Sequence, residues 1–125
     1  MILHILLGSP PLKMNLKVSG SARYSRTDQV EGLYILKKGL ENGKNYWFHQ
    51  GGYLAVWWED DGDDWYVGLV SEIGQNRGYI YASNSVSWPT NHRKVWKYVK
   101  DDTFMEVTKD DDVVFEDWSG IPGDT

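Results

Sequence analysis

Apolar and polar residues alternate in short runs along this chain, a pattern that predicts strands rather than helices. Gly, Asn, β-branched or aromatic residues interrupt every window long enough for an ordinary helix. The runs bounded by turn residues, which we expect to form strands, are residues 16–18, 33–36, 46–49, 53–58, 65–70, 78–82, 95–99, 104–108 and 113–118. We therefore predict an all-β fold, a small antiparallel barrel or sandwich built from consecutive hairpins.

Two dipeptides mark hairpin turns between these runs. Asn42-Gly43 and Asp61-Gly62 are typical of type I′ turns, in which both central residues have positive φ. If Asp61 and Gly62 occupy the centre of their turn, the register of the hairpin is fixed by the loop. Trp58 then faces Trp65, and Trp57 faces Tyr66.

The two faces of this second hairpin differ in composition. One face is apolar throughout and is expected in the core; its pairs are Leu54–Leu69, Val56–Val67 and Trp58–Trp65. The other face places Tyr53, Trp57 and Tyr66 around the small residues Ala55 and Gly68, which would leave a shallow depression between aromatic rings. If it is exposed, this face is the expected ligand-binding surface. If another segment covers it, it is a second core layer.

The tip of the same hairpin is strongly acidic. Five carboxylates lie within the six positions from Glu59 to Asp64. Because Ca²⁺ prefers oxygen ligands, the candidate metal ligands are Asp60, Asp61, Asp63 and Asp64. An EF-hand is excluded, since its first and twelfth positions would be Trp57 and Gly68. A solvated acidic turn is the alternative, because Asp also favours turns through bonds to its own backbone.

Length and composition set the domain organisation. At 125 residues the chain fits one domain, which we place at residues 14–125, with an N-terminal extension at residues 1–13. The absence of Cys excludes disulfides and thiolate metal sites. The apolar run at residues 1–7 is too short to span a bilayer and lacks the basic flank of a signal peptide. We expect no transmembrane segment and no membrane partner; the compartment stays open, with an intracellular location favoured.

Charge and motif content argue against several classes of function. Acidic residues are concentrated in the Glu59–Asp64 loop and in residues 101–125, a distribution that disfavours nucleic acid as a partner of those regions. The three His residues lie far apart in the sequence, and no nucleophile or phosphate-loop motif is present. We therefore expect neither an enzyme nor a cofactor. A small carboxylate-dependent hydrolase remains the catalytic alternative, because its acidic pair needs only spatial proximity.

Several short motifs, taken in order, resemble a known module. They are Leu16-Lys17-Val18-Ser19-Gly20-Ser21, Val30-Glu31-Gly32-Leu33-Tyr34, Glu41-Asn42-Gly43-Lys44-Asn45-Tyr46, Trp57-Trp58, Trp65-Tyr66-Val67-Gly68, Tyr79-Ile80-Tyr81-Ala82-Ser83, Pro89 and Trp96. The chain resembles, over about residues 16–98, an unnamed repeat-like module of protist and invertebrate proteins. The resemblance implies a mobile, non-catalytic module used for binding or assembly. The acidic Glu59–Asp64 turn and the acidic residues from Asp101 onward depart from its pattern.

These observations together lead to one expected function. Aromatic rings beside carboxylates and amides are typical of surfaces that bind glycans or peptides. We expect a non-catalytic binding or assembly module that recognises a protein or glycan partner through Tyr53, Trp57 and Tyr66. The remaining alternative outside catalysis is a Ca²⁺-dependent adhesion element that uses the Glu59–Asp64 loop.

Overall fold

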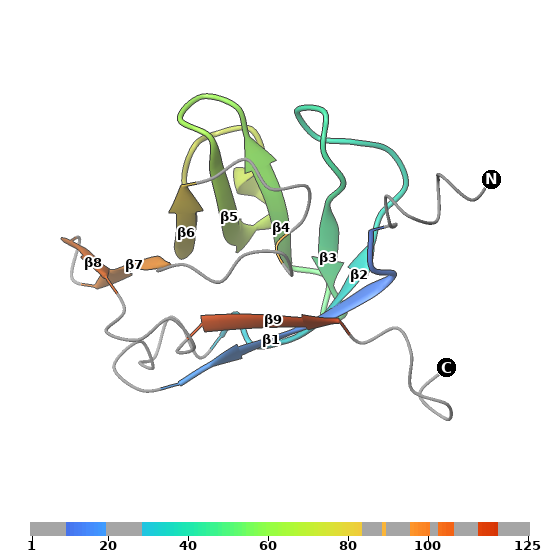
Figure 1. The fold of residues 1–125 in the computed structure, drawn as a ribbon, viewed down its shortest axis with the longest axis horizontal. Helices are drawn as coiled ribbons and strands as arrows, with labels where there is room; N and C mark the ends of the chain where they lie inside the picture. The colour runs from blue at the N-terminus through green and yellow to red at the C-terminus, as the bar shows by residue number, and fades with distance from the viewer. Residues whose placement is uncertain are drawn as a thin grey trace, which may run out of the picture.

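One antiparallel sheet forms the fold (Figure 1). The computed structural model describes residues 10–19, 29–83, 89, 96–100, 103–106 and 113–117. The strands are β1 (Lys13–Val18), β2 (Gly32–Leu36), β3 (Trp47–His49), β4 (Leu54–Glu59), β5 (Asp64–Leu69), β6 (Ile80–Ser83), β7 (Lys97–Lys100), β8 (Thr103–Glu106) and β9 (Val113–Asp117). Their order across the sheet is β8-β7-β6-β5-β4-β3-β2-β1-β9. The strands up to β8 thus pair in sequence order, and β9 returns to pair with β1.

The sheet curls around one apolar core and so forms a half-barrel. In Figure 1, β1 and β9 run across the view at a steep angle to β4 and β5. The curl brings rings from distant segments together: the ring centroids of Trp96 and Phe115 are 5.5 Å apart, and those of Trp47 and Trp65 are 6.1 Å apart. Other buried members of this inner core are Met14, Leu16, Val18, Val30, Tyr34, Leu54, Val56, Val67, Ile80, Ala82 and Val113. Alternate residues of β1, β4 and β5 belong to this core, which explains the period-two pattern of the sequence there.

The polar ends of two buried aromatic side chains of this core have backbone partners. Trp47 Nε1 donates a hydrogen bond to the Pro11 carbonyl oxygen at 2.8 Å, and the Tyr34 hydroxyl donates to the Val30 carbonyl oxygen at 2.6 Å. Burial raises the pKa of Tyr34 above its ordinary value. Both bonds remove the desolvation penalty that an unpaired donor would bring into the core.

The predicted all-β fold class is confirmed. Within the described residues, each predicted run overlaps an observed strand, and a short 3-10 turn, η2, lies at Val70–Glu72. β1 begins at Lys13, and the carbonyl oxygen of Leu12 already accepts a hydrogen bond from the Leu36 N–H at 2.9 Å. Residues 1–9 of the predicted extension, and the acidic clusters at 101–102 and 110–112, lie outside the described residues.

Both predicted hairpins form, with one difference in turn geometry. Trp57 pairs with Tyr66 and Trp58 with Trp65, which confirms the predicted register. The turn itself is different, because positive φ falls on Gly62 (100°) and Asp63 (57°) instead of Asp61 and Gly62. The ladder ends at the pair Glu59–Asp64, which leaves a four-residue loop, residues 60–63. A four-residue loop and a two-residue loop with the same centre give the same register.

Candidate functional site

The predicted aromatic surface is a second, buried layer on the outer face of the sheet. Trp57 is 0% exposed and Tyr66 only 8% exposed, whereas Tyr53 is 78% exposed. The rings of Trp57 and Tyr66 stack at a centroid distance of 5.7 Å, and Tyr66 stacks on Tyr81 at 5.6 Å. The expectation that Trp57 and Tyr66 form an open binding face is therefore wrong, and the alternative of a second core layer holds for them.

The loop between β5 and β6, residues 70–79, covers this layer, and we call it the covering loop. Val70 and Ile73 pack on the outer cluster of Ala55, Trp57 and Tyr66. Its close approach depends on two glycines: a Cβ on Gly68 would lie 2.8 Å from the Gly78 Cα, and a Cβ on Gly78 would lie 2.8 Å from the Val67 carbonyl oxygen. The depression predicted over Ala55 and Gly68 is thus filled by the chain itself.

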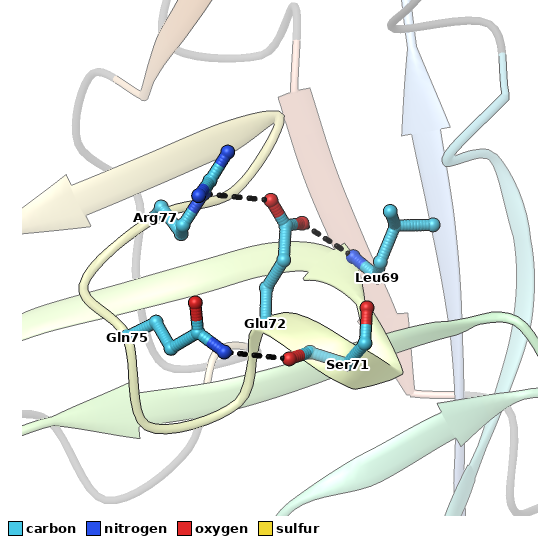
Figure 2. A network of polar contacts seen from close by, with 5 residues as sticks. All are labelled: Leu69, Ser71, Glu72, Gln75 and Arg77. Atoms are coloured by element: carbon cyan, nitrogen blue, oxygen red, sulfur yellow. Dashed lines mark hydrogen bonds and ion pairs between the residues drawn. The ribbon is translucent and has the colours of Figure 1, made fainter.

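A small polar network holds the covering loop in place (Figure 2). The Glu72 carboxylate accepts a hydrogen bond from the Leu69 N–H at 2.8 Å and pairs with the Arg77 Nε at 3.2 Å. The Gln75 side chain donates to the Ser71 carbonyl oxygen at 2.9 Å. Figure 2 shows Glu72 between Leu69 and Arg77, so this one carboxylate joins the end of β5 to the far side of the loop.

Glu59 joins three segments on the same face. It is a charged side chain that is only 5% exposed. One oxygen, Oε2, accepts hydrogen bonds from Trp57 Nε1 and from the Gly74 N–H, each at 2.6 Å. The other, Oε1, accepts one from Asn42 Nδ2 at 3.0 Å. We call Glu59, Trp57, Gly74 and Asn42 the Glu59 junction; it ties the hairpin to the 41–44 turn and to the covering loop.

The carboxylates of the acidic tip beyond Glu59 lie mostly at the surface. Asp60, Asp61 and Asp63 are exposed, and Asp64 is half-buried. Among the residues that the structure describes, no group of three or more His, Asp or Glu side chains could hold a metal ion. Asp61 instead accepts a hydrogen bond from Asn76 Nδ2 at 2.9 Å, which ties the tip to the covering loop. The candidate calcium ligands Asp60, Asp61, Asp63 and Asp64 are therefore not brought together.

The pKa of Tyr66 on this face is higher than the ordinary value for tyrosine. Burial, followed by the negative charge of Asp64, raises the pKa of Tyr66 to about 12. The Tyr66 hydroxyl lies 3.5 Å from the Asp64 carboxylate as a donor. Because this proton is held more tightly than usual, Tyr66 stays neutral across the physiological range.

Both ring nitrogens of His49 form hydrogen bonds to backbone groups. Its Nδ1 accepts a hydrogen bond from the Gly51 N–H at 3.0 Å, so its Nε2 is the nitrogen that donates to the Glu31 carbonyl oxygen at 2.9 Å. A Cβ on Gly32 would lie 2.6 Å from that Nε2, which shows how closely the ring fills its site. His49 thus fixes the β3–β4 turn against the start of β2.

An apolar region of the outer face lies beside the covered layer, over β2 and β3 and the start of β4. Ile35 is 40% exposed and pairs in register with the half-buried Phe48. Leu33 lies on the same side of β2, and Tyr53 precedes β4 at an outward-facing position. We call Leu33, Ile35, Phe48 and Tyr53 the outer patch. The pairing of the predicted strands could have located this patch, because Leu33, Ile35 and Phe48 alternate with inward-facing residues.

Lysines border the outer patch. Lys37 Nζ lies 4.8 Å from the centroid of the Phe48 ring, a cation–π contact. Lys13 pairs in register with Ile35, and Lys17 bonds to Glu116 at 3.0 Å. The charged residues at outward-facing positions of β1, β2 and β3 are lysines only. Lys13 and Lys37 therefore give the border of the patch positive charge, whereas Lys17 is paired with Glu116 on β9.

Comparisons with known proteins add no identification. The chain matches no family model, no curated protein and no solved structure. Within the described part of the chain, no helix has the length and apolar character needed to cross a membrane.

Proposed function

We propose that this chain is a non-catalytic binding module that contacts a protein or glycan partner through the outer patch. The observation that carries the proposal is the exposure of apolar side chains beside a second, already filled apolar layer. Tyr53 is 78% exposed and Ile35 40% exposed on a face where Trp57 is fully buried. Clustered apolar exposure of this kind marks interaction sites more often than scattered single residues do.

The chemistry of the patch also indicates what kind of partner it fits. Ile35 and Phe48 offer aliphatic and aromatic contact, and Tyr53 adds a ring with a hydroxyl, a residue type enriched where proteins bind partners. Lys13 and Lys37 at the border favour a partner that carries carboxylates. An acidic peptide segment or an acidic glycan satisfies both requirements.

The rigidity of the surrounding face supports the same role. The outer patch borders the layer that the Glu59 junction and the covering loop hold in place. Leu33, Ile35 and Phe48 lie on strands, and Tyr53 directly precedes β4. A binding surface on a preorganised scaffold loses less conformational entropy when a partner docks.

Peptide and glycan arrays probed with the labelled chain test the proposal. The variants are Ile35→Asp and Tyr53→Ser, and the control is Leu40→Ser, which changes a residue that is 59% exposed in the loop between β2 and β3. We expect acidic array members to be enriched and each patch variant to weaken binding by roughly tenfold, the effect of about 1.4 kcal/mol. Binding that survives both patch variants but is lost in the control would place the site elsewhere.

A further inference from the structure

Asn42 is the residue of the Glu59 junction that carries reactive chemistry. It lies in the turn between β2 and β3, where Glu41 and Lys44 exchange backbone hydrogen bonds at 2.9 and 3.1 Å. Asn42 and Gly43 have φ values of 52° and 86°, as a type I′ turn requires. An Asn followed by Gly is the sequence most prone to intramolecular attack on the Asn side chain, because Gly has no Cβ to hinder the approach of its nitrogen.

We propose that Asn42 is a site of spontaneous deamidation, and that its conversion releases the 41–44 turn from Glu59. The Gly43 backbone nitrogen attacks Asn42 Cγ and loses its proton. A new C–N bond closes a succinimide ring, the Cγ–Nδ2 bond breaks, and ammonia leaves. Water then opens the ring at either carbonyl, which leaves an aspartyl or an isoaspartyl residue. No oxidant or enzyme is needed, because water is the only co-reactant.

The site is open to this reaction on its solvent side. Asn42 and Gly43 are both exposed, and among the described residues other than Gly43 and its two neighbours, no heavy atom lies within 4 Å of the position that a Cβ on Gly43 would occupy. Water and hydroxide therefore reach the dipeptide from solvent. On the other side, Asn42 Nδ2 donates to the Trp58 carbonyl oxygen at 2.9 Å and to Glu59 Oε1 at 3.0 Å. These two bonds hold the side-chain amide in place, so conversion in the folded chain is slower than in the unfolded chain.

The consequence of conversion follows from what Asn42 contacts. Both of its partners are acceptors: a carbonyl oxygen and a carboxylate oxygen. A carboxylate in place of the amide removes the donor and sets a second negative charge beside the buried Glu59. Like charges at this separation repel, and the repulsion is strongest where one of them is shielded from water. The turn must then move away from the end of β4.

The chain contains a matched internal control. Asn76 is also exposed, also has a positive φ (50°), and also donates its Nδ2 to a carboxylate, that of Asp61, at 2.9 Å. The residue that follows it is Arg77, whose side chain hinders attack by the backbone nitrogen. Asn76 should therefore remain unmodified over a period in which Asn42 converts.

The test is peptide mapping by mass spectrometry of the full chain incubated at mildly alkaline pH, with and without urea. We expect Asn42 to convert to aspartyl and isoaspartyl products before Asn76 does, and faster in urea. Equal conversion of Asn42 and Asn76 would show that Asn42 is not a preferred deamidation site. Conversion of Asn42 only in the unfolded chain would show that it is not a deamidation site of the folded protein.

A second measurement tests the consequence of conversion. Asn42→Asp should lower the thermal midpoint, and Asn76→Asp, beside the exposed Asp61, should change it less. Asn42→Asp should also accelerate hydrogen exchange of the Gly74 amide proton, because the Gly74 N–H and Asn42 both bond to the Glu59 carboxylate. If Asn42→Asp has the same thermal midpoint and the same Gly74 exchange rate as Asn76→Asp, conversion of Asn42 does not release the 41–44 turn from Glu59.

Discussion

Removal of the Glu59 carboxylate tests whether one buried charge joins three segments of this protein. Glu59→Ala leaves three donors without their acceptor: Trp57 Nε1, the Gly74 N–H and Asn42 Nδ2. Hydrogen bonds to a charged group contribute about 1.5–3 kcal/mol each, although water can replace part of this at the exposed Asn42. We therefore expect a loss of roughly 4 kcal/mol in the free energy of unfolding, within the range seen when one partner of a buried charged contact is removed.

Glu59→Gln separates the contributions of the two oxygens. Its single carbonyl oxygen can replace Oε2 and keep the bonds from Trp57 and Gly74. Its NH₂ group then faces Asn42 Nδ2, a contact between two donors. The expected loss is about 2 kcal/mol, less than for Glu59→Ala.

Urea unfolding followed by tryptophan fluorescence measures both variants. The matched control is Asp60→Ala, at the next position, where the side chain is exposed and the expected change is within about 0.5 kcal/mol. Trp57→Phe in combination with Glu59→Ala, each of which removes the indole–carboxylate bond, gives a double-mutant cycle, for which we expect a coupling free energy of roughly 1 kcal/mol. A Glu59→Ala variant as stable as Asp60→Ala, or a cycle without coupling, would show that the Glu59 carboxylate does not hold these segments together.

Three further predictions concern the covered layer. Gly68→Ala should lower the free energy of unfolding, measured by urea titration, by about 1–3 kcal/mol, because its Cβ would lie 2.8 Å from the Gly78 backbone. An unchanged urea midpoint would mean that the covering loop does not pack against Gly68. Since the pKa of Tyr66 is raised from 10.0 to about 12, its neutral form contributes stability that is complete below pH 10 and is lost between pH 10 and 12. The thermal midpoint of Tyr66→Phe should therefore fall less than that of the unchanged chain over this pH range, and parallel pH profiles would contradict this. Glu72→Ala should accelerate hydrogen exchange of the Leu69 amide, because the carboxylate that bonds to Leu69 and Arg77 is lost. Unchanged exchange would show that the network in Figure 2 does not hold the covering loop in place.

The pattern of the sequence determines the strands and the hairpin register because both depend on local periodicity. Alternation identifies the inward-facing residues, and a turn centred on Asp61-Gly62 aligns Trp57 with Tyr66. The turn type could not be predicted as well. Asp63 tolerates positive φ almost as readily as Asn does, so a loop that places the left-handed residues one position later is also accessible.

The burial of Trp57 could not be predicted from its own hairpin. Whether the outer face is open depends on the segment after β5, and loops carry little periodic signal. Two features do mark the covering loop in hindsight: apolar Val70 and Ile73 within an otherwise polar stretch, and the glycines that permit close approach. The charge pattern groups Glu59 with the acidic tip, yet strand alternation places Glu59 on the same side as Trp57, where it accepts the indole hydrogen bond.

The most direct test of the proposed function is a residue-level footprint on the labelled chain. Nuclear magnetic resonance spectra are recorded while an acidic peptide or glycan from the arrays is added. Binding through the outer patch predicts shifts that centre on Leu33, Ile35, Phe48 and Tyr53, with little change at Asp60–Asp63. Shifts that centre on the acidic tip, or no shifts on the outer face with a ligand that binds, would contradict it.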